Sequence, residues 1–362
     1  MMALRSTTNA GDGRTMTRFH VCCAALGITL GACGVAVETP PPTTTTATQP
    51  GIEMQGIEMQ GIEMQGIEMQ GMTMQGFRVA GATLSGAALS NVRVERGEVV
   101  AERGSTTLRG TALKDAHFFA QVHDLSVTPP AAATVEYRIT AIATEASKYD
   151  PTHTGNTFLY TLEQWVASTG AWQQACGADA DGHSVAIPLA AIWDEHGDRS
   201  VSSSLFTFGC TTGVIAKCYR WGYRPWVTGW GDLVATHQTC TRVARADYCG
   251  LGITGTRDNT KINVWDNLQR PGPIQAHGGG LLQLPPPLML FEAGWNVEGA
   301  VCLSHARWIL QDGPDIAALC PGRLVPPGLL GETVCDTLSA VLGLDPHARM
   351  FDEAYLNGIL AP

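Results

Sequence analysis

Apolar residues recur at every fifth position from Gly51 to Glu95, and again in a shifted phase from Ser105 to Phe119. The word Gly-Ile-Glu-Met-Gln is repeated four times from Gly51, and looser copies of it follow. The fourth position is apolar in every word, as at Met54, Val79 and Leu89. A period of five matches neither the 3.6-residue period of a helix nor the two-residue period of a strand. The pattern instead predicts a coil that turns a corner at every word and keeps the fourth residue inside.

The same words resemble the pentapeptide-repeat family, whose four words make one square turn of a right-handed β-helix. The resemblance implies a short β-helical stalk over residues 51–120. Isoleucine at the second position, as at Ile52 and Ile57, departs from the small residue that this family prefers. An irregular spacer is therefore the alternative. Both interpretations give the segment a structural role, because no catalytic group recurs in it.

The pattern changes to that of a globular domain over residues 121–362. Residues 232–250 predict a helix with Asp232 as its N-cap and Gly250 as its C-terminal stop. Segments rich in β-branched and aromatic residues predict three strands, at 133–143, 157–167 and 184–193.

Two further elements complete the prediction for this domain. Residues 256–266 predict a hairpin that turns at Asp258-Asn259, and the segment 331–346 predicts a short helix that ends at Gly343 and Pro346. Strands and helices do not alternate along the chain. The order therefore favours an α+β domain over a doubly wound sheet.

Residues 1–32 are typical of a signal peptide. Arginines precede an apolar run that is too short to span a bilayer, which needs about 20 residues. The run closes on Leu-Gly-Ala-Cys at Cys33, which resembles the bacterial lipobox. This resemblance implies lipid attachment at Cys33, and Gly34 in place of an aspartate implies the outer membrane. An ordinary secreted protein cut nearby is the alternative. Residues 33–50, rich in Pro and Thr, predict an extended linker.

Composition and charge narrow the partners of the chain. Its 362 residues are 44% hydrophobic and only 15% charged, and the formal net charge is −10. No run of Lys or Arg occurs, so we expect no nucleic-acid binding, which needs a concentrated basic surface. We expect no cofactor.

The cysteines indicate an oxidising compartment. Of 11 cysteines, Cys22 and Cys23 lie in the signal peptide and Cys33 is the lipid site, which leaves eight. An even number in an exported chain predicts disulfides, with the pairing left open. No pair has the C-x-x-C spacing of structural zinc. The predicted disulfide cysteines are Cys176, Cys210, Cys218, Cys240, Cys249, Cys302, Cys320 and Cys335.

Three motifs of the C-terminal half resemble the ADYC domain of bacterial exported proteins. They are "LFTFGCTTGVIAKCYRWGYRPW", "ARADYCG" and "GAVCLSHARW". The family is named for the tetrapeptide Ala246-Asp247-Tyr248-Cys249, and the resemblance covers roughly residues 130 to 360. It implies export and implies no particular reaction, substrate or catalytic residue.

Two places in the sequence are candidates for catalysis. Asp247 is a candidate general acid or base if burial raises its pKa, whereas a salt bridge to Arg242 or Arg245 is the structural interpretation. Cys302 and His305 would share one face of a helix and form a thiolate–imidazole pair. A disulfide at Cys302 is the alternative.

No metal site is predicted. His183, His196 and His277 lie in polar or Gly-rich loops, where histidines are usually plain surface residues. The segment Asp-Ala-Asp-Gly-His, residues 179–183, lacks the later acidic positions of a calcium-binding loop.

The densest aromatic stretch is a candidate binding surface. Its rings would stack on sugars and its arginines would bind anionic groups, while burial of the rings in the core is the alternative. The residues are Tyr219, Arg220, Trp221, Tyr223, Arg224, Trp226 and Trp230.

These patterns together predict a lipid-anchored cell-envelope protein with a disulfide-stapled α+β domain behind a repeat stalk. We expect a binding or structural module without catalytic activity on the outer membrane, with a glycan or another envelope polymer as its partner. The alternative is an envelope hydrolase that uses Cys302 with His305, or Asp247.

Overall fold

Everything described below belongs to the compact unit Ala47–Pro362 of the computed structural model of this chain. The predicted signal peptide, Cys33 and the linker lie outside the described residues. The structure describes residues 57–59, 77–124, 131–146, 156–179, 181–194, 196–202, 205–256, 260–268, 289–307, 316–323, 335 and 338–355.

The larger sheet of the described chain has ten strands. They are β2 (Phe77–Leu84), β3 (Ala87–Glu95), β4 (Glu98–Arg103), β5 (Thr106–Arg109), β6 (Ala116–Asp124), β7 (Ala131–Ala146), β8 (Asn156–Val166), β9 (Ala171–Gln174), β10 (Ala186–Leu189) and β13 (Leu205–Cys210). Their order is β13-β10-β8-β7-β6-β2-β3-β4-β5, with β9 paired to β8. Because β13 also pairs with β2, the strands from β13 to β2 close into a ring of antiparallel pairings.

Every second side chain along the strands points into this barrel, and these side chains fill its interior. Phe118, Tyr160 and Phe208 come from β6, β8 and β13. The Phe208 ring packs against the other two, with centroids 6.3 Å from Phe118 and 5.5 Å from Tyr160. Residues that alternate with the inward-facing ones along the strands, such as His117 and Glu163, lie on the outer face and are partly exposed. The barrel therefore has an apolar interior and a polar outside, as a two-residue period requires.

The five-residue coil is wrong for the described part of its range, residues 77–119. These residues form β2 to β6 and the short 3₁₀ helix η1 (Gly110–Leu113), and all of their strand pairings are antiparallel. The chain reverses at Ser85-Gly86 and at Arg96-Gly97, where both residues have positive φ, as in the type I′ turns of hairpins. Hairpins therefore replace the coil.

The inward direction predicted for the fourth position of each word is confirmed at five positions, and Val94 is partly buried against the same core. Leu84, Leu89, Leu108, Leu113 and Phe118 are all buried in the barrel core. Of the glycines that begin words, Gly86 supplies the turn between β2 and β3, whereas Gly81 lies inside β2. In the earlier words the structure describes only β1 (Ile57–Met59), a strand.

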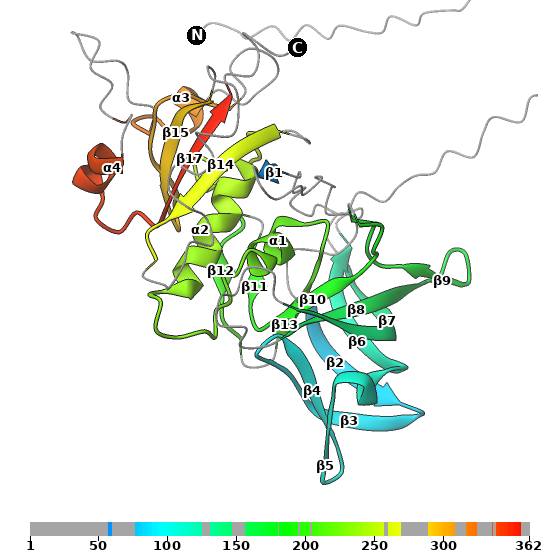
Figure 1. The fold of residues 1–362 in the computed structure, drawn as a ribbon. Coiled ribbons are helices and arrows are strands. Elements are labelled where there is room, and N and C mark those ends of the chain that lie inside the picture. Colours follow the sequence, from blue (N-terminus) through cyan, green and yellow to red (C-terminus); the bar gives the residue numbers. More distant parts are fainter. Residues whose placement is uncertain are drawn as a thin grey trace, which may run out of the picture. The chain divides into compact units, whose positions relative to one another are not determined.

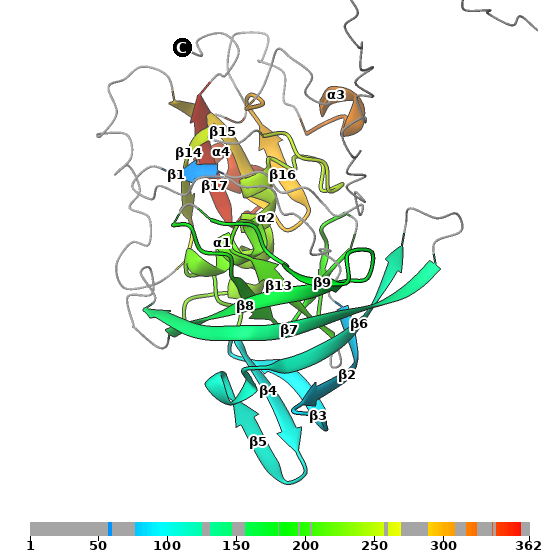
Figure 2. The ribbon, with the colours of Figure 1, turned by 90° about the vertical axis from the view of Figure 1, so that its right-hand side faces the viewer.

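Two helices lie between the barrel and a second, five-stranded sheet (Figures 1 and 2). The helices are α1 (Val214–Arg220) and α2 (Leu233–Arg245). The second sheet has the order β1-β14-β17-β15-β16, with β14 (Thr260–Asp266), β15 (Met289–Asn296), β16 (Gly299–Leu303) and β17 (Met350–Tyr355). One hydrophobic cluster contains residues of β10, both helices and strands β14 to β17, so the helices are covered on both sides.

Helix α2 begins where the sequence predicts and ends earlier. The Asp232 carboxylate accepts the N–H of Ala235 at 3.0 Å, which confirms the N-cap. The helix ends at Arg245 because Ala246 adopts the left-handed conformation at φ 52°. Gly250, the predicted stop, serves another purpose: a Cβ there would collide with the carbonyl oxygen of Glu298.

Among the remaining predicted elements, some are confirmed and one is wrong. The strands predicted at 133–143 and 157–167 are confirmed as β7 and β8, and 184–193 contains β10 and β11 (Ile192–Trp193), which pairs with β12 (Arg199–Ser200). The predicted hairpin over 256–266 is wrong, because β14 pairs with β17 and β1. Short helices are α3 (Ile316–Leu319) and α4 (Leu338–Leu344). Helix α4 confirms a helix within residues 331–346, but it continues through Gly343, its predicted end.

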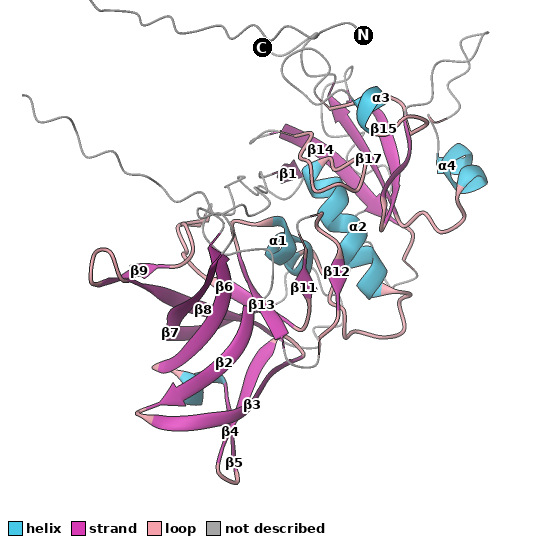
Figure 3. Ribbon diagram, turned by 180° about the vertical axis from the view of Figure 1, so that it is seen from behind, coloured by secondary structure: helices cyan, strands magenta, loops and turns pink. Residues whose placement is uncertain are grey.

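The fold class is mostly β, with few helices, rather than clearly α+β (Figure 3). Every predicted cysteine is bridged, in the pairs Cys176–Cys210, Cys218–Cys240, Cys249–Cys320 and Cys302–Cys335. The disulfide-stapled domain is confirmed. Disulfides of this number indicate an exported chain in an oxidising compartment. Among the described residues no helix is long and apolar enough to cross a membrane.

Candidate functional site

The Ala-Asp-Tyr-Cys turn follows α2 directly, and Asp247 organises it. Asp247 is fully buried and accepts Arg242 Nη1 at 2.5 Å. It also accepts the N–H groups of Leu251 and Gly252 at 3.1 and 3.0 Å. A carboxylate that is surrounded by donors and closed to solvent holds the turn together and has no access to substrate. The salt bridge predicted between Asp247 and Arg242 is confirmed.

Tyr248 links this turn to the second sheet. Its hydroxyl donates to Glu292 Oε1 at 2.7 Å and accepts the N–H of Arg307 at 2.8 Å. Its ring stacks on Trp295 at 5.2 Å between centroids. Burial, followed by the nearby Glu292 charge, raises the pKa of Tyr248 well above its usual value, so the phenol stays protonated. Cys249 then bridges to Cys320 and completes the motif.

Two buried carboxylates share one arginine beside Tyr248. Arg307 Nε donates to Glu292 Oε2 and Arg307 Nη2 donates to Asp352 Oδ2, both at 2.8 Å, and all three side chains are fully buried. Trp295 Nε1 also donates to Asp352, at 2.7 Å. Burial, followed by the Glu292 charge, raises the pKa of Asp352 well above its usual value. This cluster has the residues of an acid–base pair, but it lies inside the core between β15 and β17.

The aromatic stretch predicted as a binding surface lies inside the molecule, so that prediction is wrong. Tyr219, Trp221 and Tyr223 have no exposed area, and Arg224 and Trp230 are also buried. The reason is their position on and after α1, which is covered by the barrel and by α2.

Both arginines of this stretch have partners within the fold. Arg220 forms a bidentate pair with Glu145 at 2.8 Å and contacts Asp179. Arg224 donates to Thr157 Oγ1 at 2.7 Å and stacks on Tyr219. Trp226, half-buried, packs on Tyr219 at 5.0 Å between ring centroids. The core interpretation of the stretch is confirmed.

Cys302 and His305 do not form a nucleophile pair. Cys302 lies in strand β16 instead of a helix, and its sulfur is bonded to Cys335. His305 is largely buried, and this burial lowers its pKa, which keeps the ring neutral. The predicted geometry, two residues on one helix face, is therefore wrong.

Of the loop histidines, His183 lies beside two carboxylates. The ligand atoms of His183, Asp179 and Asp181 all lie within 4.8 Å of one another. Asp179 already accepts the N–H groups of Asp181 and His183 and contacts Arg220 Nη1 at 3.3 Å. These contacts explain the loop as a local turn. His196 lies on the surface near Leu251, and His277 lies outside the described residues.

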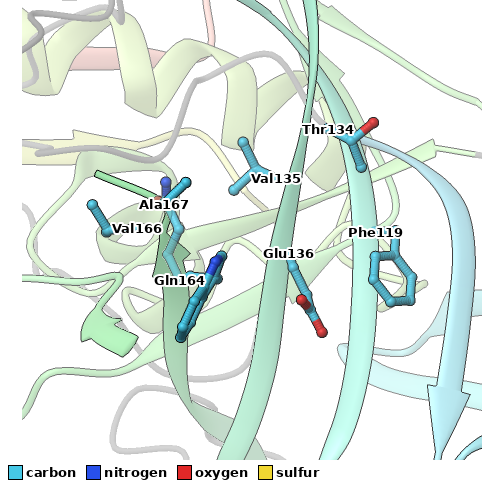
Figure 4. A pocket seen from close by; sticks show the side chains of 8 residues that line it. Phe119, Thr134, Val135, Glu136, Gln164, Val166 and Ala167 are labelled. Carbon is cyan, nitrogen blue, oxygen red and sulfur yellow. The ribbon is translucent and has the colours of Figure 1, made fainter. Parts of the chain in front are cut away.

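A cleft in the outer wall of the barrel was missed by the sequence analysis. It has a volume of about 460 Å³ and lies between β7 and β8 (Figure 4). This volume falls in the range of about 300–1,000 Å³ that is usual for ligand sites. Its lining residues are Phe119, Thr134, Val135, Glu136, Gln164, Trp165, Val166 and Ala167.

Contacts on the outer face position the side chains beside this cleft. The rings of Trp165 and Trp172 pack edge to face at 5.4 Å. The guanidinium of Arg138 lies 4.3 Å from the centre of the Trp172 ring, and Glu136 contacts His117 Nδ1 at 2.6 Å. Trp165 keeps 38% of its surface exposed. The outward alternation of Glu136 and Trp165 in predicted strands was the available sequence signal, but only the fold shows that they are neighbours.

Comparison with curated proteins and with solved structures gives no match. A comparison with protein-family models gives a match to the ADYC domain over residues 110–309. The matched range includes the buried Asp247 turn, Tyr248 and Arg307, and it covers more than half of the chain. The chain therefore belongs to the ADYC domain family.

Proposed function

We propose that this chain is a lipid-anchored cell-envelope protein whose domain binds a ligand and catalyses no reaction. Cys33 is the proposed lipid site, and the outer membrane is the proposed location. The proposed ligand is a component of the envelope. The protein would act as a displayed binding module, held to the membrane through the acyl chains on Cys33.

One observation carries this proposal: the reactive groups of the family motif are used within the fold. Asp247 is buried under backbone and arginine donors, Tyr248 is hydrogen-bonded in the core, and Cys249 is bridged. A catalytic group must contact its substrate, with a pKa suited to proton transfer or with a free nucleophile. The motif residues therefore stabilise the fold. Because none of them is available to a substrate, they support a binding module rather than an enzyme.

The second candidate function is that of an envelope hydrolase. The sequence suggests that it would use Asp247, or Cys302 with His305, in catalysis. The structure argues against both forms of it. Asp247 is closed to solvent and the Cys302 sulfur is part of a disulfide. A disulfide sulfur cannot act as a thiolate nucleophile.

The ligand surface we propose is the cleft between β7 and β8. The stretch from Tyr219 to Trp230 no longer qualifies, because most of its rings are buried. The cleft combines the half-exposed Trp165 with polar and apolar walls, which is the usual composition of a binding site.

Intact mass of the protein extracted from membranes, with and without alkylation under non-reducing conditions, tests this proposal. We expect acyl chains on Cys33 and no alkylation of the eight downstream cysteines. The Cys33→Ser variant is the control and should lose both the lipid mass and membrane retention. Ready alkylation of Cys302 in the native protein would revive the hydrolase. An unmodified Cys33 would reject the anchor.

A further inference from the structure

The cleft in the barrel wall is a break in the pairing of two neighbouring strands. The β7–β8 ladder runs as far as Tyr137↔Gln164 and stops there. At the same register, the next pairs would be Glu136 with Trp165, Val135 with Val166, and Thr134 with Ala167. These six residues instead line the cleft, together with Phe119 and Gln164. The two strands therefore separate at the point where three more pairs were available.

Within the described part of the chain, backbone groups of β7 face this gap without a paired strand. Residues 131–136 of β7 pair with β6 on one side, and no other described strand pairs with them on the β8 side. In an antiparallel sheet, alternate residues direct their N–H and C=O groups to opposite neighbours. Every second residue of this segment therefore presents both groups to the cleft. A strand edge of this kind is a template for another strand.

The side chains on the two faces of the gap differ in kind. Val135 packs against the barrel core, and Val166, at the matching register, belongs to the same face. Glu136 and Trp165 belong to the outer face, where Trp165 is 38% exposed. One face of the gap is therefore apolar, and the other combines a carboxylate with an indole ring.

We propose that this cleft binds an extended peptide segment of another envelope protein, which adds a strand between β7 and β8. The segment carries a small apolar residue opposite Val135 and Val166. The next residue is Lys or Arg, which lies between Glu136 and Trp165. This inference rests on the proposed binding function and names the class of its ligand.

The chemistry favours such a peptide over other ligands. Only a backbone in extended form matches the regular spacing of N–H and C=O groups along two facing strands. A cation beside Glu136 gains an ion pair, and the Trp165 ring adds a cation–π contact. A saccharide would use the ring and the carboxylate but would leave most of the strand edge unpaired.

Titration of the full, oxidised chain with three synthetic peptides tests the proposal. The first is acetyl-Val-Lys-Val-Lys-Val-amide, the second has the same sequence with alternate backbone amides N-methylated, and the third has Glu in place of Lys. We expect the first to bind and to protect amides of residues 134–136 and 165–167 from hydrogen exchange. N-methylation should weaken binding at least about tenfold, because it removes strand hydrogen bonds.

Two variants test the side-chain part of the proposal. Glu136→Lys should weaken binding of the Lys peptide about fivefold and improve binding of the Glu peptide. Glu163→Lys is the matched control, since Glu163 lies on the same outer face but outside the cleft lining. It should leave both affinities within about twofold. Thermal unfolding confirms that each variant is folded.

Equal binding of the N-methylated peptide would overturn strand addition, and so would absence of binding by the Lys peptide. A hexamer of N-acetylglucosamine is titrated in parallel. If it binds at the cleft while the peptides do not, the peptide inference fails and the proposed binding function stands. Turnover of any of these probes would instead reject the binding function itself.

Discussion

Arg242 and Asp247 form a buried ion pair that many other contacts support. Arg242 also pairs with the Asp198 carboxylate and donates to the carbonyls of His196 and Val297. Removing one member of a buried pair leaves the other charge without compensation, which is more costly than the net value of the pair. Contacts within the fold thus explain why Asp247 is charged and buried in this turn.

Asp247→Asn should lower the free energy of unfolding by about 3–5 kcal/mol, because Arg242 remains charged in the core. Asp198→Asn provides the matched control, since Asp198 pairs with the same arginine but its side chain is 59% exposed. We expect a loss below about 1 kcal/mol there. Urea denaturation of the oxidised variants measures both. Equal losses would contradict the special role of Asp247.

His237 predicts how stability depends on pH. Burial, and then the charge of Arg199, lowers the pKa of His237 to about 3 from an ordinary value of 6.5. Its folded-state pKa lies below the unfolded one, so this contribution to stability is full above pH 6.5 and is lost as the pH falls towards 3. The slope should approach about 1.4 kcal/mol per pH unit within that interval.

Urea denaturation at several pH values measures this slope. The His237→Gln variant should lose that part of the acid sensitivity, because glutamine does not titrate. The exposed His183 offers a control, and His183→Gln should leave the slope unchanged. An identical pH dependence in all three proteins would show that His237 is not the titrating group.

At the scale of elements, the hairpin between β3 and β4 is fixed to the barrel and helix at its turn. Gly97 has φ 77°, and a Cβ there would overlap the Tyr219 hydroxyl and the Trp226 ring. The N–H of Val99 donates to Tyr160 in β8 at 2.9 Å. This hairpin therefore packs against residues far from it in sequence.

Gly97→Ala should destabilise the protein more than Gly86→Ala does. Both glycines occupy hairpin turns with nearly equal φ, 77° and 76°, so each substitution carries a backbone cost of about 1–2 kcal/mol. Nothing lies within 4 Å of the new Cβ at Gly86, whereas Tyr219 and Trp226 must move at Gly97. Chemical denaturation compares the two, and equal losses would remove the packing argument.

Local chemistry decided which elements were predictable. The Asp232 cap and the alternation of β7 and β8 depend on neighbours in sequence, so they were predicted correctly. The five-residue period is compatible with two structures. One is a coil, and the other is a set of short hairpins whose turns fall between words. The choice depends on distant partners: β2 pairs with β6 and β13. The same limit explains Trp221, whose burial depends on covering layers that no local pattern reveals.

The whole molecule joins strands from both sides of residue 120, where the sequence predicts that the repeat ends and the domain begins. Strand β2 lies before this point and strand β6 spans it, and both strands belong to the barrel wall. Phe118 of β6 lies in the barrel core. The disulfides, by contrast, all join residues after position 170.

A chain that begins at residue 121 should therefore fail to unfold cooperatively and should bind a dye for exposed apolar surface, because it lacks β2 and most of β6. A chain that begins at residue 77 retains the complete wall and is the control. Calorimetry of both measures cooperativity. A sharp transition of the shorter chain, at a similar temperature, would show that residues 121–362 fold alone.

The strand that closes the barrel also sets the order in which the protein can be completed. Phe77 of β2 is paired with Phe206 of β13, on the far side of more than a hundred residues. A chain that leaves the ribosome or a membrane channel with its N-terminus first presents β2 long before β13 arrives. During that interval one edge of the sheet stays open to other chains. Until Phe206 is available, this open edge therefore exposes the growing chain to aggregation.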